Sequence, residues 1–89
     1  MRYANETECE AAGVDPAKVE SIARRLSKAA REAQAMGLTV FGGSGTGSLR
    51  FCDSDEKGNL VVADLDGVFD GGDGAADRDG AGLLRGEYV

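Results

Sequence analysis

The fold of this chain is decided by residues 15–37, which read DPAKVESIARRLSKAAREAQAMG. Asp15 is a favourable helix N-cap, and Pro16 stands at the first helical position, where its missing N–H group costs nothing. Gly37 suits the left-handed conformation that ends many helices. Between these ends, apolar residues recur at the three- and four-residue intervals of one helix face. They are Val19, Ile22, Leu26, Ala30 and Ala33. The pattern predicts one long helix over residues 15–36.

Three apolar segments after this helix have the composition of β-strands. They are residues 38–41, 49–52 and 60–65. Residues 83–88 are predicted as a C-terminal strand that would make a fourth. These segments predict an α+β fold, in which one long N-terminal helix packs on a small antiparallel meander of three to four strands.

The segments outside the helix and strands differ in character. Residues 1–13 are polar and lack a sustained period, so we expect an N-terminal arm that is either a frayed tail or a short helical turn near residues 6–12. Residues 66–82 alternate glycine with aspartate and predict an acidic loop that Phe69 anchors. Residues 14–89 are predicted to form a single domain.

Composition limits both the core and the range of partners. With 89 residues and 6% aromatics, the chain has material for one small core. Its net charge of −6 argues against binding a nucleic-acid backbone, which requires a basic surface. The charge is unevenly spread, because residues 16–36 are net basic whereas residues 53–80 are strongly acidic.

Several classes of chemistry have no suitable residues here. The chain contains no histidine, so zinc, haem and histidine-based acid–base sites are not expected. Cys9 and Cys52 are too far apart for a redox or zinc motif, and we expect ordinary thiols in a reducing cytoplasm. The first residues do not resemble a secretory signal, and no run approaches the roughly 20 apolar residues of a membrane span. No cofactor, membrane contact or enzymatic activity is predicted.

A glycine-rich segment, GGSGTGS over residues 42–48, follows the first predicted strand. Its outer glycines have the spacing of a P-loop, but Ser48 stands where that motif has lysine. A strand follows, whereas a phosphate site needs a helix N-terminus. The segment therefore favours a hairpin loop, with anion or small-ligand binding by its backbone N–H groups as an alternative. The ligand-binding candidates are Gly43, Ser44, Gly45 and Thr46.

Calcium binding is a second alternative. Residues 53–64 match part of an EF-hand loop, with acids at its first, third and twelfth positions and glycine at the sixth. Lys57 at the fifth position opposes cation binding, and strands flank the segment where an EF-hand has helices. A solvated hairpin turn is the simpler interpretation, so no metal site is assigned.

The charged surfaces are the remaining candidates for function. The basic side of the helix and the acidic loop are either solvated faces or docking surfaces for a partner protein. The acidic half either imitates a phosphate backbone or serves solubility alone. The partner-binding candidates are Arg24, Arg25, Lys28, Arg31, Asp66, Asp70, Asp73 and Asp77.

Two segments carry a resemblance to a known group of proteins. Residues 37–50, GLTVFGGSGTGSLR, and residues 62–67, VADLDG, resemble small accessory proteins of temperate phages and prophages in GC-rich bacteria. The resemblance implies a short acidic protein that binds and modulates or inhibits a protein in the host cytoplasm. It transfers no site residues. A virion or assembly component is a further alternative, and self-association as a homodimer is compatible with the alanine-rich helix.

Overall fold

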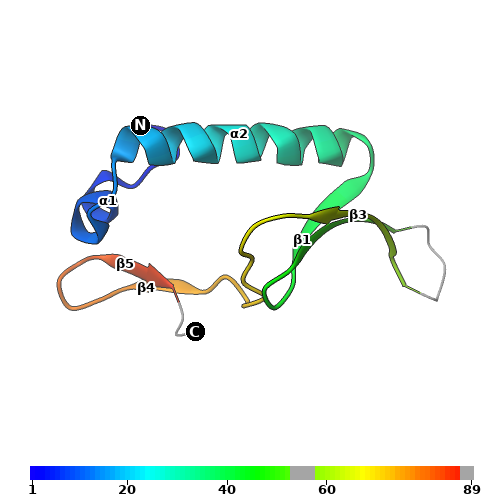
Figure 1. Cartoon of the computed structure of the whole chain (residues 1–89). Coiled ribbons are helices and arrows are strands. Elements are labelled where there is room, and N and C mark those ends of the chain that lie inside the picture. The colour runs from blue at the N-terminus through cyan, green and yellow to red at the C-terminus, as the bar shows by residue number, and fades with distance from the viewer. Residues whose placement is uncertain (53–57, 87–89) are drawn as a thin grey trace. The chain divides into compact units, whose positions relative to one another are not determined.

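The computed structural model describes residues 1–52 and 58–86 and confirms the α+β class (Figure 1). Its elements are α1 (Glu6–Ala12), α2 (Pro16–Ala35), β1 (Leu38–Gly42), β2 (Gly47–Phe51), β3 (Leu60–Leu65), β4 (Ala76–Arg78) and β5 (Leu84–Gly86). They form two compact units. The terminal unit combines Met1–Ser27 with the chain from Asp73 onward, and the sheet unit is Lys28–Gly72. Helix α2 runs through both.

The long helix begins and ends where the sequence predicts. The Asp15 side chain accepts a hydrogen bond from the backbone N–H of Ala17 at 2.9 Å, which satisfies one of the unpaired donors at the helix start. At the other end, Gly37 has a φ of +77° and donates its N–H to the Gln34 carbonyl at 3.0 Å. Glycine adopts this left-handed conformation without a Cβ clash, so the helix stops there.

The sheet unit contains the predicted antiparallel meander, in the order β1-β2-β3. Strand β3 has the predicted bounds, whereas β2 begins two residues earlier than predicted because Gly47 pairs with Gly42. A hydrogen bond from Gly43 N–H to the Thr46 carbonyl at 2.6 Å closes the connecting loop. The register between β2 and β3 shifts by a β-bulge at Leu49 and Arg50.

Phe69 anchors the first part of the acidic loop to the sheet unit. A Cβ built on Gly47 would stand 2.6 Å from two atoms of the Phe69 ring, so the ring lies directly on that glycine. The Phe69 carbonyl accepts the N–H of Gly45 at 2.9 Å. Gly42 and Gly67 also lie within 4 Å of the Phe69 side chain in the same construction. The absence of side chains on these glycines makes room for the ring.

The terminal unit shows that the N-terminal arm contains a helix, the second of the two predicted alternatives. Helix α1 ends at Gly13, whose φ is +72°. The carbonyl of Cys9 accepts the N–H of Val14 at 3.0 Å, and Cys9 is buried. Both cysteines are free thiols.

The C-terminal strand forms as predicted but does not join the meander, which has three strands, the lower of the two predicted numbers. Strand β5 pairs antiparallel with β4 in a separate two-stranded sheet, and β4 lies inside the predicted loop 66–82. The turn between them is built locally, because Asp79 N–H donates to the Leu83 carbonyl at 2.9 Å and Gly82 N–H donates to the Asp79 carbonyl at 3.0 Å. The last predicted strand residues, 87 and 88, lie outside the described residues.

The buried apolar residues in the described parts of the chain are small. They are Ala4, Cys9 and Ala33. Larger apolar side chains remain in contact with solvent, and on α2 the exposed fractions of Ile22 and Leu26 are 49% and 65%. In the described ranges, no helix is both long enough and apolar enough to cross a membrane.

Candidate functional site

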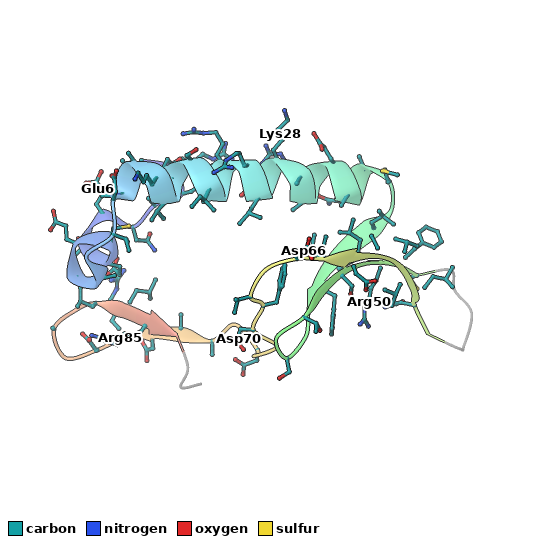
Figure 2. All side chains as sticks on the ribbon, in the orientation of Figure 1. Glu6, Lys28, Arg50, Asp66, Asp70 and Arg85 are labelled. Atoms are coloured by element: carbon teal, nitrogen blue, oxygen red, sulfur yellow. The ribbon has the colours of Figure 1, made fainter. Side chains whose placement is uncertain are left out.

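Three of the four predicted basic residues share one face of α2. Arg24, Lys28 and Arg31 are separated by four and three residues, which places them one above another along the helix. All three are exposed, and Figure 2 shows the Lys28 side chain projecting away from the ribbon. We call these three residues the cationic row. Arg25 is not part of it, because it lies about 100° from Arg24 and about 120° from Arg31 around the helix.

Arg24 is paired with the carboxylate of Glu20, which lies one turn earlier on the same helix. Glu20 is only 7% exposed, and its Oε2 atom accepts a hydrogen bond from Arg24 Nη2 at 3.4 Å. Its Oε1 atom accepts the backbone N–H groups of Tyr3 and Ala4, both at 2.8 Å. Glu20 therefore fastens the N-terminal arm to α2.

The bonds to Glu20 also set its ionisation. The N–H of Ala4 makes the largest contribution to holding the pKa of Glu20 below its ordinary value. Desolvation acts in the opposite direction, whereas the N–H of Tyr3 and the charge of Arg24 lower the pKa further. The carboxylate form is the one that binds the arm.

The four predicted aspartates fall in different units. Asp66 and Asp70 belong to the sheet unit, whereas Asp73 and Asp77 belong to the terminal unit. Three of them have local backbone partners: Asp70 accepts the N–H of Gly72 at 2.9 Å, Asp73 that of Ala75 at 2.9 Å, and Asp77 that of Arg78 at 2.8 Å. These are side-chain-to-backbone bonds of the kind that shape turns. The aspartates of the acidic loop therefore shape its turns in addition to carrying charge.

Asp79 was not among the predicted site residues, yet it organises the β4–β5 turn. Its Oδ1 atom accepts the N–H groups of Ala81 at 2.9 Å and Leu83 at 3.0 Å, and its Oδ2 atom accepts Arg85 Nε. The bond to Arg85 is the leading cause of the lowered pKa of Asp79. A sequence signal for this role exists, since Asp three residues before Gly82 is typical of a tight turn.

The terminal unit also contains an open groove of about 840 Å³ between α1 and the β4–β5 hairpin. One hydrogen bond crosses it, from Leu84 N–H to Glu8 Oε2 at 3.1 Å. Alanines of α1 line one wall, whereas the hairpin contributes acidic and basic side chains in about equal number. This mixed lining does not select one class of ligand. Sequence reasoning missed the groove because its walls come from opposite ends of the chain.

The glycine loop is less suited to an anion than its sequence suggests. Of the predicted ligand-binding residues, Gly43 donates its N–H to Thr46 and Gly45 donates its N–H to Phe69. Two of the amide donors that would hold a ligand are therefore engaged within the protein. Ser44 and Thr46 are exposed at the tip.

The calcium alternative has no counterpart in the described ranges, 1–52 and 58–86, where no group of three or more Cys, Asp or Glu side chains is placed to hold a metal ion. Two of the three acids that suggested an EF-hand loop, Asp53 and Asp55, lie outside those ranges.

Comparison with protein-family models, curated proteins and solved structures finds no match to this chain. The site is therefore interpreted from its own geometry.

Proposed function

We propose that this chain is a small non-enzymatic interaction protein that docks its cationic row on an acidic surface of a host protein and modulates or inhibits that protein. The row itself carries the proposal, because α2 presents Arg24, Lys28 and Arg31 on one face at the spacing of successive helical turns. Among the described residues, Glu20 is the carboxylate that pairs with the row, through Arg24. Lys28 and Arg31 keep their charges exposed to solvent.

Net charge makes this face selective. The whole chain has a charge of −6, so an acidic partner repels most of its surface and attracts the cationic row. Electrostatic complementarity of this kind orients an encounter and raises the association rate. The resemblance of residues 37–50 and 62–67 to phage and prophage accessory proteins supports a bacterial protein as the partner.

The experiment uses a photo-crosslinking residue in place of Ala35, which lies on the same helix face as the cationic row and is exposed. Irradiation of bacterial cells that express the full chain is expected to yield a discrete adduct with one host protein. In the row variant Arg24→Gln, Lys28→Gln, Arg31→Gln the adduct should be lost. Affinity for the identified partner should fall about 3- to 150-fold, since each of the three exposed charge pairs is worth about 0.2–1 kcal/mol.

Lys18→Gln is the matched control, because it removes an exposed cation from another side of the same helix. Its adduct should persist. Glutamine is a good helix former, so circular dichroism should show unchanged helix content in every variant. An adduct of equal yield in the row variant and the parent, or no adduct at all, would overturn the proposal.

A further inference from the structure

We propose that α2 binds α2 of a second copy of this chain as an antiparallel helix pair, with a twofold axis between Ser27 and Lys28. The proposal depends on the residues of α2 and not on the proposed function. Its basis is an apolar face of α2 whose residues recur at alternating intervals of three and four, which is the heptad pattern of coiled coils. These residues are Val19, Ile22, Leu26, Ala29 and Ala33.

The central part of this face is open to solvent. Leu26 is 65% exposed and Ile22 is 49% exposed, and Ala29 is exposed beside them. Ala33 is buried, so the contact surface is centred on Leu26 and Ala29. A leucine at such a position on a surface helix is normally covered.

The apolar positions are complementary to themselves in the antiparallel direction. With the axis between residues 27 and 28, Leu26 of one helix lies opposite Ala29 of the second copy. By symmetry, Ala29 of the first helix lies opposite Leu26 of the second copy. A large side chain thus meets a small one in both central layers, which is how packed helices interdigitate. Ala23 lies opposite Ala30 of the second copy on one flank, where two small residues allow the backbones to approach closely.

The charges on the other flank favour the same arrangement. Arg25 and Glu32 are both exposed and stand seven residues apart at equivalent heptad positions. In the antiparallel register, Arg25 of each helix lies opposite Glu32 of the second copy, so two symmetric ion pairs form. In a parallel pair, Arg25 would lie opposite Ala30, and no ion pair would result. The charge pattern therefore selects a second copy in the antiparallel direction.

The cationic row is left free by this pairing. Arg24, Lys28 and Arg31 lie on a different side of α2 from Leu26, so one dimer presents two rows to solvent. Docking of the row and pairing of the helices can therefore be tested separately.

Sedimentation equilibrium of the full chain, over about 5–500 μM under reducing conditions, should show a monomer–dimer equilibrium. Leu26→Glu should raise the dissociation constant about a hundredfold or more, because two leucines leave the interface and two like charges enter it. Ala17→Glu is the matched control, since it adds the same charge to the opposite side of α2 and should leave the dimer intact.

Charge reversal tests the direction of the helices. Arg25→Glu alone and Glu32→Arg alone should each weaken the dimer, because each places like charges opposite one another. The double variant Arg25→Glu, Glu32→Arg should restore the parent dissociation constant to within about threefold. A chain that remains monomeric throughout, as it would if its own residues covered Leu26, overturns the proposal. So does a dimer that Leu26→Glu leaves unchanged, and so does a double variant that is not rescued.

Discussion

Gly47→Ala is expected to lower the free energy of unfolding of the sheet unit by about 1–3 kcal/mol, the usual cost of forcing an extra group into an occupied space. The new Cβ would stand 2.6 Å from the Phe69 ring, closer than two carbon atoms approach. The backbone of Phe69 is held by the bond from Gly45 N–H to its carbonyl, so a shift of this residue disturbs the glycine loop as well. Urea denaturation of the full chain measures the change.

Phe69→Ala provides the partner for a double-mutant cycle. Alone, it should cost about 2–3 kcal/mol, less than a fully buried phenylalanine, because Phe69 is partly exposed. In the Phe69→Ala background the clash is gone, and Gly47→Ala should then be neutral or stabilising, since alanine suits a strand better than glycine. Equal costs of Gly47→Ala in the two backgrounds would contradict direct contact between the ring and this glycine.

The second large effect is expected at Glu20. Glu20→Ala should release the N-terminal arm, because the N–H groups of Tyr3 and Ala4 lose the carboxylate oxygen that accepts both of them. Hydrogen exchange at these two amides should rise towards the rate of an unstructured peptide. Glu32→Ala is the matched control, because it removes an exposed carboxylate from the same helix. Unchanged protection at Tyr3 and Ala4 in Glu20→Ala would contradict the structure.

Acid should reproduce this release. The pKa of Glu20 is lowered in the folded chain, so its contribution to stability is fully present above the unfolded value of about 4.3. That contribution is lost as the pH falls through the lower, folded pKa, because the protonated carboxyl is a weaker acceptor. Glu20→Gln should remove this pH dependence from the amides of Tyr3 and Ala4.

The pKa of Asp79 is shifted in the same direction as that of Glu20, but the two carboxylates bind different backbone amides, so exchange at those amides distinguishes them. The pKa of Asp79 is lowered chiefly by Arg85, so acid should loosen the amides of Ala81 and Leu83 in both the parent and the Glu20→Gln variant. Global melting reports both groups together, whereas amide exchange separates them. If the amides of Tyr3 and Ala4 still lose protection in acid in the Glu20→Gln variant, the titrating group is not Glu20.

The candidate site was predictable to the extent that it depends on helical spacing. Once residues 15–36 are assigned to a helix, the intervals between Arg24, Lys28 and Arg31 place these three cations on one face. The aspartates of residues 66–79 were recognisable as charge, but their bonds to backbone N–H groups depend on turns that composition does not specify. Glu20 was missed because its environment comes from residues 3 and 4, which lie outside its own helix.

The local elements of this protein can be predicted from its sequence alone. Asp15, Pro16 and Gly37 mark the ends of α2 because caps act over a few neighbouring residues, and the apolar strand segments are likewise recognisable within their own length. Three features become visible only in the folded chain: β5 pairs with β4, Glu20 holds the N-terminal arm, and Phe69 covers Gly47. Each of these contacts joins residues that are distant along the chain or separated by a turn. Which segments meet is set by the packing of the folded chain, and a local pattern does not encode it.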